Sequence, residues 1–330
     1  TDNGTSLGID PSAYNYLAVG ESVVLTYSYD VVDGHGGSVM QTVTITIDGK
    51  NDAPTVSAAV TSTTDEDQAG FSLNLLTNAS DVDLSDTLSV SNLTQTNAAD
   101  ASGITDNGNS LGIDPSAYNY LAFGESVVLT YSYDVIDSKG GSVAQTLTIT
   151  INGVNDAPTV SAAVTSMTDE DQAGFNLNLL TNASDVDLTD MLNVSNLMLT
   201  GGNAGGVMLN ANGTSLDIDP SAYNYLAVGE SEVISYSYDV IDGKGGSVMQ
   251  TVTITIDGKN DAPTVSAAVS SVTDEDQASF SLNLLTNASD VDTTDMLSVS
   301  NLMQTNAGDA SGITDNGTSL GIDPSAYNYL

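Results

Sequence analysis

Two long stretches of this chain alternate apolar and polar residues with a period of two. Residues 127–135 place valine, leucine or tyrosine at every second position. Residues 143–151 alternate mostly valine, leucine and isoleucine with alanine and threonine. Successive side chains of a strand point to opposite faces of its sheet, so this pattern predicts two strands that each bury one face.

Shorter apolar runs precede this pair and predict further strands at 55–61, 71–76, 88–93 and 111–114. We expect no helix beyond a single turn at 116–121. About seven short strands in about 100 residues, separated by turns, are typical of an immunoglobulin-like β-sandwich.

The sequence Asn-Asp-Ala-Pro recurs at residues 51, 155 and 260, a spacing of 104 and then 105 residues. Proline resists helix and central strand and biases the preceding residue toward extended geometry, so each occurrence predicts a joint between copies of one unit. A net extra residue in the glycine-rich stretch 201–213 indicates a surface loop. The predicted fold class is all-β: tandem immunoglobulin-like sandwiches of one 104-residue period, joined end to end. The predicted domains are the C-terminal part of a repeat at 1–50, complete repeats at 51–154 and 155–259, and the N-terminal part of a repeat at 260–330.

The composition narrows the classes of partner. Forty-three acidic residues against four lysines give a formal net charge of −39. Such a chain repels nucleic acid and anionic membrane surfaces, both of which attract basic groups. No apolar stretch approaches the ~20 residues of a membrane span, so we expect no direct membrane insertion. The chain has no cysteine, which excludes disulfides and thiolate chemistry. Because it begins at Thr1 without a signal peptide, we interpret it as a piece of a longer protein.

The carboxylates cluster in each repeat. In the repeat 51–154 they gather at Asp52, in the triplet Asp65-Glu66-Asp67 and in the turn Asp81–Asp86. Dense carboxylates with few basic partners repel one another, and Ca²⁺, which takes ~6–8 oxygen ligands, would relieve that repulsion. Asp81 and Asp83 would share a face if this segment were extended. The alternative interpretation is that Asp and Asn only build turns and keep the surface soluble.

Known short calcium motifs do not match. Residues 81–92 lack the glycine and the final glutamate of an EF-hand loop, and the nonapeptide of parallel β-rolls is absent. The order of longer motifs is more specific. Asn-Asp-Ala-Pro is followed by Asp-Glu-Asp-Gln, Asn-Ala-Ser-Asp-Val-Asp, Gly-Glu-Ser, Tyr-Asp-Val-Ile-Asp and a Thr-Ile-Thr-Ile strand. This order resembles the bacterial cadherin-like (VCBS-type) repeats of giant calcium-dependent adhesins exported by type I secretion, and most closely the extender type of repeat found in an ice-binding adhesin.

The resemblance implies immunoglobulin-like units strung into a rod, with calcium at the joints and within domains. It implies that Asn155, Asp156 and the triplet Asp169-Glu170-Asp171 share one joint site with Asp137 of the preceding repeat. Asp185 and Asp187 would hold a second ion. The spacing of Asn152-Gly153-Val154-Asn155-Asp156 differs from the tighter Asp-x-Asn-Asp of animal cadherins. The full set of candidate calcium ligands is Asp33, Asn51, Asp52, Asp65, Glu66, Asp67, Asp81, Asp83, Asp86, Asp137, Asn155, Asp156, Asp169, Glu170, Asp171, Asp185, Asp187, Asp190, Asp242, Asn260, Asp261, Asp274, Glu275, Asp276, Asp290 and Asp292.

Three classes of function are open to such a chain. The first is a calcium-stiffened spacer on the outside of a bacterial cell, with calcium ions and neighbouring repeats as its partners. The second is a ligand-binding adhesin module for sugar or protein, with Tyr118 and Tyr120 as stacking platforms. The third is an enzyme, which would have to work with carboxylates alone, as glycosidases do. We favour the spacer over the binding module because the chain has no tryptophan and its tyrosines recur at core-like positions. We expect no enzyme, because glycoside hydrolysis needs a deep aromatic cleft, which a sandwich of ~100 residues lacks. The incomplete repeats at the two ends further predict head-to-tail self-association of this chain.

Overall fold

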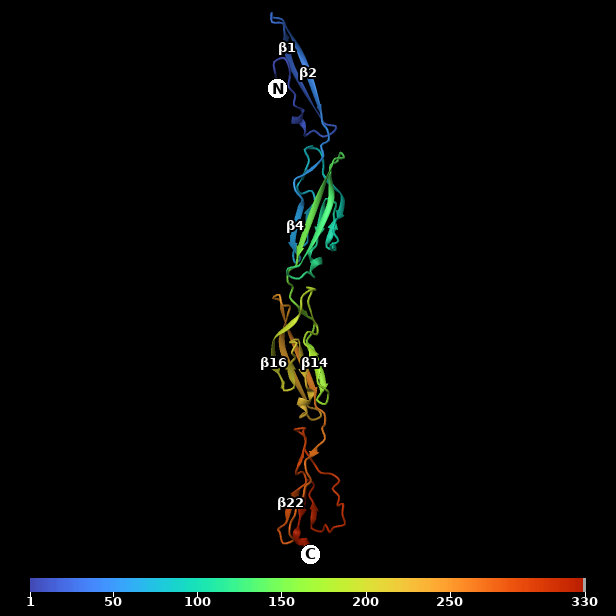
Figure 1. The fold of residues 1–330 in the computed structure, drawn as a ribbon, viewed down its shortest axis with the longest axis vertical. Helices are drawn as coiled ribbons and strands as arrows, with labels where there is room; N and C mark the ends of the chain where they lie inside the picture. The colour runs from blue at the N-terminus through green and yellow to red at the C-terminus, as the bar shows by residue number, and fades with distance from the viewer. Residues whose placement is uncertain (329–330) are drawn as a thin grey trace. The chain divides into compact units, whose positions relative to one another are not determined.

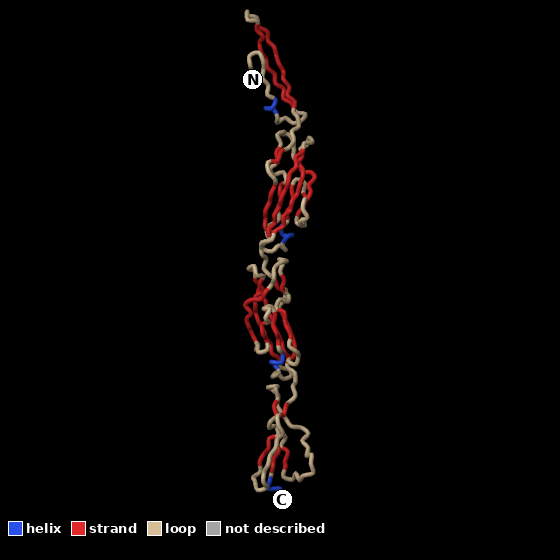
Figure 2. Tube along the Cα trace, viewed as in Figure 1, coloured by secondary structure: helices blue, strands red, loops and turns tan. Residues whose placement is uncertain are grey.

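The structure is a computed structural model that describes residues 1–328. The chain forms two compact units. The first comprises Thr1–Asp156 with Val186–Asp190, and the second comprises Ala157–Asp185 with Met191–Leu330. Figure 1 labels the strands used below, and Figure 2 shows that strands and loops make up nearly all of the described chain. The only helical elements among residues 1–328 are four short 3₁₀ turns, so the predicted all-β fold is confirmed.

The elements of the first unit are η1 (Pro11–Tyr14), β1 (Ser22–Val32), β2 (Ser38–Asp48), β3 (Thr55–Val56), β4 (Val60–Asp65), β5 (Phe71–Asn74), β6 (Ala79–Ser80), β7 (Ser89–Gln95), β8 (Ile104–Asp106), β9 (Ser110–Ile113), η2 (Pro115–Tyr118), β10 (Ser126–Ile136) and β11 (Ser142–Asn152). Strands β3 to β11 form a sandwich. One layer has the order β4-β11-β10-β7 and the other the order β5-β9-β8, while β3 and β6 form a separate two-stranded sheet. Strands β6 and β8 were not predicted, and the predicted strand 55–61 is interrupted between β3 and β4.

The long hairpin of this sandwich supplies most of its core. Tyr131, Tyr133 and Val135 on β10 are buried, as the period of two predicted. Leu147 on β11 packs in the same cluster. One buried position on β11 is polar: the Gln145 amide donates a hydrogen bond to the Ala58 carbonyl at 2.9 Å. Ala58 lies in the interruption between β3 and β4, so this bond gives the buried Gln145 amide a partner.

The pairing of β4 decides where its acidic end lies. β4 runs parallel to β11, and Asp65 is the partner of Asn152. Figure 1 shows β4 beside the long hairpin. Because parallel strands end at the same edge of a sheet, residues that follow β4 reach the end of β11, where the chain leaves the sandwich. The Asp-Glu-Asp triplet is therefore early in the repeat by sequence and at its far end in space.

The 3₁₀ turn η2 places the first tyrosine of the Tyr-Asn-Tyr motif, Tyr118, in the core. Asp114 caps the turn by accepting a hydrogen bond from the Ser116 N–H. Tyr118 is fully buried, and its hydroxyl donates to the Asp100 carbonyl at 3.0 Å. Burial raises the pKa of Tyr118 to about 12. Tyr118 is therefore a structural residue, and its ring does not form a surface for stacking.

The elements of the second unit are β12 (Thr159–Val160), β13 (Val164–Asp169), β14 (Phe175–Asn178), β15 (Ala183–Ser184), β16 (Asn193–Gly201), β17 (Val207–Leu209), β18 (Ser215–Ile218), η3 (Pro220–Tyr223), β19 (Ser231–Ile241), β20 (Ser247–Asp257), β21 (Thr264–Val265), β22 (Phe280–Asn283), β23 (Ala288–Ser289), β24 (Ile313–Asp315), β25 (Ser319–Ile322) and η4 (Pro324–Tyr327). Strands β12 to β20 repeat the sandwich, with β13-β20-β19-β16 as the four-stranded layer and β14-β18-β17 in the other. Its core is a separate cluster of buried residues that includes Leu179, Tyr238 and Ile254.

Two parts of the chain contain only some of these strands. Residues 1–50 contain the hairpin β1–β2 as a two-stranded sheet. Residues 260–328 contain β21 to β25, and the positions that correspond to β13 and β16 are loop there. No helix among residues 1–328 combines the length and the apolar composition needed to cross a bilayer.

Candidate metal centre

The carboxylate of Glu66 is the centre of an acidic site in the first unit. Glu66 has 0% exposure, and its Oε1 accepts a hydrogen bond from the Val154 N–H at 2.6 Å. Its Oε2 is buried and has no hydrogen-bond donor among the described residues. Burial raises the pKa of Glu66, and the neighbouring charges of Asp187, Asp156 and Asp67 raise it further. A buried carboxylate with a missing partner is costly unless a cation neutralises it.

Asp156 and Asp187 complete this site from the adjoining stretch of chain. The Asp156 N–H donates to Asp187 Oδ2 at 3.0 Å, and the Asn119 amide donates to Asp156 Oδ2 at the same distance. Asp187 is 2% exposed. The N–H of Leu188 donates to the Tyr120 carbonyl at 3.3 Å. These bonds hold Asp156 and Asp187 in the acidic site, where the charges of both act on Glu66.

Gly153 lets the backbone pass close to neighbouring carbonyl groups on its way to this site. A Cβ at Gly153 would collide with the carbonyl oxygens of Ala122 and Leu121. The Gly153 N–H also donates to the Glu125 carbonyl at 2.9 Å. Any larger residue would push the chain away from the loop that follows η2, and with it Val154 away from Glu66.

The second unit repeats the arrangement around Glu170. Glu170 is buried, accepts a hydrogen bond from the Lys259 N–H, and has a buried Oε2 without a donor among the described residues. Burial raises the pKa of Glu170, and the charges of Asp171, Asp292 and Asp261 act in the same direction. The Asp261 N–H donates to Asp292 Oδ2 at 2.9 Å. The same site is therefore built twice from equivalent residues.

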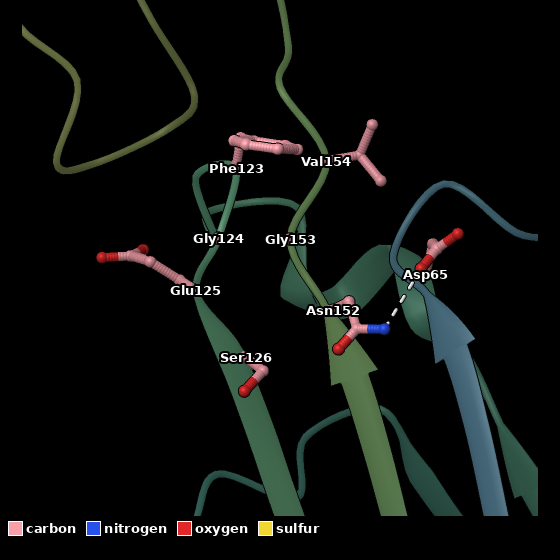
Figure 3. Close-up of a pocket in the computed structure, with 8 residues that line it drawn as sticks. All are labelled: Asp65, Phe123, Gly124, Glu125, Ser126, Asn152, Gly153 and Val154. Carbon is pink, nitrogen blue, oxygen red and sulfur yellow. Dashed lines mark hydrogen bonds between the residues drawn. The ribbon is translucent and has the colours of Figure 1, made fainter. Parts of the chain in front are cut away.

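The two sites balance their charge differently. In the first unit Asp65 pairs with Asn152, whose amide donates to Asp65 Oδ1 at 3.3 Å (Figure 3). In the second unit the corresponding pair is Asp169 and Asp257, two carboxylates on adjacent strands. There the Lys259 Nζ lies 3.7 Å from Asp169 Oδ2. The first unit has Val154 at the position of Lys259. The lysine offsets the additional carboxylate.

A second acidic cluster lies at the other end of the sandwich of the first unit. Carboxylate oxygens of Asp81, Asp86 and Asp137 lie within 4.8 Å of one another. Both oxygens of Asp86 are buried without a hydrogen-bond donor in the described part of the chain. Burial raises the pKa of Asp86, and the charge of Asp137 raises it further. In the second unit, Asp185 and Asp242 come equally close.

Asp137 is held in place by its own turn. Its Oδ1 accepts hydrogen bonds from the N–H groups of Lys139, Gly140 and Gly141 at 2.6–2.9 Å, and its Oδ2 accepts one from the Asn51 amide at 3.1 Å. Burial acts to raise the pKa of Asp137, but these bonds outweigh it, and the pKa is lowered. Asp137 therefore stays ionised beside Asp86.

The turn Asp81–Asp86 is bent, so the expected shared face of Asp81 and Asp83 is wrong. The Asp83 N–H donates to Asp81 Oδ1 at 2.9 Å, which folds the segment. Asp81 joins Asp86 and Asp137, whereas Asp83 Oδ2 accepts from the Asp52 N–H at 2.8 Å. A local side-chain bond overrode the alternation that an extended segment would have shown.

The grouping implied by the resemblance also differs from the structure. Asp156 lies with Glu66 and Asp67 of the preceding repeat, and Glu170 lies with Asp261 and Asp292. The reason is that β4 runs parallel to β11, and β13 runs parallel to β20. Each pairing carries the acidic triplet to the end of its own repeat. The amides of Asn119 and Asn224 were not predicted as part of the sites, although Tyr-Asn-Tyr recurs in every copy.

The remaining predicted residues lie as follows. Asp33 is exposed, and hydrogen bonds from His35 and Gly37 lower its pKa. The triplet Asp274-Glu275-Asp276 is exposed in a segment without a parallel partner strand. Asp290 accepts from the Asp292 N–H at 3.2 Å. The other positions are Asn155, whose amide donates to the Asp156 carbonyl, Asn260, whose amide donates to the Asp261 carbonyl, and Asp190, whose N–H donates to the Asp187 carbonyl.

A shallow depression of about 400 Å³ borders the first site and is the natural place to look for a small-molecule site. Figure 3 shows Phe123 over Gly124 and Gly153, with Glu125 directed away from Asp65. Glu125 Oε2 accepts a hydrogen bond from the Ala122 N–H at 3.1 Å, so this carboxylate closes its own turn. The side chains around the depression do not converge on a common point, which a catalytic pair would require.

The donor set of the acidic sites suits one kind of ion. The groups are carboxylates and amide oxygens. The chain has no cysteine, and its one histidine is His35, in the turn of the β1–β2 hairpin. Hard oxygen donors in sets of three or more fit Ca²⁺, and buried oxygens without donors are the atoms that such an ion would contact. The residues present therefore fit calcium.

Fold and site together define a protein of tandem β-sandwiches with buried carboxylate clusters. The family model of the cadherin-like domain matches residues 50–152, 154–257 and 259–329, and the chain belongs to this family. The predicted resemblance to cadherin-like repeats is thereby confirmed. Members of this family are extracellular modules with adhesion or spacer roles, they are typically not enzymes, and they generally bind Ca²⁺.

Solved structures of cadherin ectodomains are similar to this chain. Human desmocollin-1 is 18% identical, over 92% of this chain and 59% of that one, with a TM-score of 0.34. PcdhgB3 EC1-4 is 15% identical over 92% and 74%, with a TM-score of 0.44. Mouse cadherin-23 EC22-24 is 15% identical over 72% and 74%, with a TM-score of 0.36. The chain thus spans less than two thirds of the desmocollin ectodomain. No curated protein sequence matches it significantly.

Proposed function

We propose that this chain is a calcium-rigidified extender segment of a bacterial cell-surface adhesin, which holds a distal adhesive domain away from the cell. The supporting observation is the pair of buried glutamates, Glu66 and Glu170, each with an oxygen that no donor in the described chain satisfies. The order of sequence motifs supports the bacterial adhesin. We also propose that the repeats begin at residues 51, 155 and 260.

The ligands that we propose come from both sides of a repeat boundary. Glu66 and Asp67 follow β4, whereas Asp156 and Asp187 belong to the sequence of the next repeat. An ion bound to all four would fix the boundary between the repeats. Extracellular calcium modules bind at ~10⁻⁴–10⁻³ M. At ~10 mM calcium each such site would add about 1.4–2.7 kcal/mol of stability by mass action.

The test compares the whole chain in calcium and in chelator. Calorimetric titration should detect calcium binding, thermal unfolding should shift upward, and the maximum dimension from small-angle scattering should increase as the boundaries stiffen. The variant Glu66→Gln removes one charge from the site and should weaken binding there. Asp106→Asn removes the same charge from an exposed strand end and should leave binding unchanged.

The proposal fails if calcium changes neither the melting temperature nor the maximum dimension of the chain. If calcium binds and stabilises but the dimension stays constant, the sites are internal supports and the spacer role is lost. The alternative role, a binding module for sugar or protein, would require a defined ligand surface. The buried Tyr118 and the depression near Phe123 do not offer one.

A further inference from the structure

Every methionine of the chain lies on the surface. Methionine is among the residue types most often buried, so an entirely exposed set is unusual. The exposed fractions are 70% for Met40, 74% for Met167, 78% for Met191, 62% for Met198, 72% for Met208, 69% for Met249, 94% for Met296 and 76% for Met303. These eight are all the methionines of the sequence. Neither hydrophobic core contains one.

The incomplete copies do not cause this exposure. Met40, Met296 and Met303 lie in residues 1–50 and 260–328, where fewer strands are present. Their counterparts in the complete sandwich of the second unit are Met249, Met191 and Met198, which are 62–78% exposed. Exposure therefore belongs to these sequence positions.

The rest of the composition restricts where an oxidant can react. The chain has no cysteine and no tryptophan, so thioethers are its most oxidisable side chains. Oxidation converts methionine into a polar sulfoxide, which disrupts a core but costs little on the surface. The cores consist of leucine, isoleucine, valine and aromatic residues. The acidic sites present oxygen atoms, which peroxide does not attack.

We propose that the exposed methionines form a peroxide-reactive coat, which takes up oxidant while the cores and the acidic sites stay intact. In each step the thioether sulfur donates an electron pair to one oxygen of hydrogen peroxide. The O–O bond breaks, an S–O bond forms, and the second oxygen leaves as water. Methionine is oxidised to the sulfoxide and peroxide is reduced. The strand positions support this role: Met167, Met198, Met208 and Met249 each occupy an outward position of a strand whose neighbouring positions are more buried.

The experiment oxidises the whole folded chain with hydrogen peroxide and counts the added oxygen atoms by mass spectrometry. We expect eight, one for each methionine, at rates within about threefold of those in the urea-unfolded chain. The melting temperature of the fully oxidised chain should match that of the untreated chain. Protection of several methionines in the folded chain, or a melting temperature that falls with each added oxygen, would overturn the proposal.

A matched variant shows what a buried methionine would do. Leu179→Met places a thioether in the core of the second unit at a position with 0% exposure, and this swap nearly conserves volume. Its ninth methionine should react at least tenfold more slowly than the others, and its oxidation should lower the melting temperature. If all nine react alike and none affects melting, exposure is not what protects this fold. Should the variant fail to fold, the comparison of folded and unfolded rates in the native chain decides.

Discussion

The hairpins β1–β2 and β10–β11 have nearly the same sequence and opposite environments. Residues 22–31 and 126–135 are identical, and both hairpins pair in the same register from the first residue to the last. Yet Tyr133 is 2% exposed, whereas Tyr29 is 49% exposed. Figure 2 shows both hairpins as continuous strand.

The difference lies in the strands that precede each hairpin. β10 and β11 are flanked by β7 and β4, and the sheet β5-β9-β8 covers their apolar face. β1 and β2 form a sheet of two strands without these partners. Local sequence is therefore sufficient for the hairpin and its register, whereas burial depends on segments up to about 90 residues away in the chain.

The largest expected effect is association between molecules, which would cover the β1–β2 hairpin and remove the difference in burial. Residues 269–274 and 298–304 correspond to β4 and β7 but form no strand, so we expect them to pair with the β1–β2 hairpin of another molecule. Sedimentation velocity over a hundredfold range of concentration should show growing species. The chain trimmed to residues 51–259 is the control and should remain monomeric. A strictly monomeric full chain at every concentration would refute this pairing.

Core truncation should separate the two hairpins clearly. Leu129 has 0% exposure and Leu25, its counterpart, is only half-buried. Leu129→Ala should cost about 2–5 kcal/mol by loss of contacts and creation of a cavity, and Leu25→Ala less than about half of that. Hydrogen exchange of the backbone amides measures the loss of stability in each hairpin separately. Equal losses would mean that the hairpin β1–β2 is covered in solution.

Removal of one hydroxyl should give a smaller difference. The Tyr133 hydroxyl donates to the Leu75 carbonyl at 2.7 Å inside the core. Tyr133→Phe leaves that carbonyl without a donor and should cost about 1–3 kcal/mol. Tyr29→Phe alters an exposed ring and should change the unfolding midpoint very little. A loss of similar size in both variants would show that the hydroxyl bond is not the cause.

Alkaline pH should destabilise the sandwich that buries Tyr133, and only moderately. Burial raises the pKa of Tyr133 to about 12, whereas an unfolded tyrosine ionises near 10. The folded state therefore holds its proton longer, and the stability that the neutral tyrosine contributes is complete below pH ~10 and declines as pH rises toward ~12. The denaturant midpoint of the sandwich 51–154 should fall between these values. Tyr133→Phe should reduce that fall, while Tyr29→Phe should retain it.

The alternation of residues 127–135 and 143–151 was enough to predict the sandwich, because period-two burial leaves a direct record in the sequence. The acidic sites were predictable only as a set of residue types. The position of Glu66 depends on the parallel pairing of β4 with β11, and nothing local to Asp65-Glu66-Asp67 encodes a partner so distant in sequence. Asp83 was misplaced for the opposite reason, since a bond to its near neighbour Asp81 bends the segment. Buried polar groups such as Gln145 were missed because alternation counts only apolar residues.

The repeated bond at the Asn-Asp-Ala-Pro motif has a genetic consequence. The N–H of Asp52, Asp156 and Asp261 donates to Asp83, Asp187 and Asp292 respectively, at 2.8–3.0 Å. Each complete copy thus carries both the triplet that ends one site and the aspartates that begin the next. A duplication or deletion of one whole copy in the gene would leave each remaining boundary with a full set of groups. The length of the array is therefore free to change by unequal recombination without any compensating mutation.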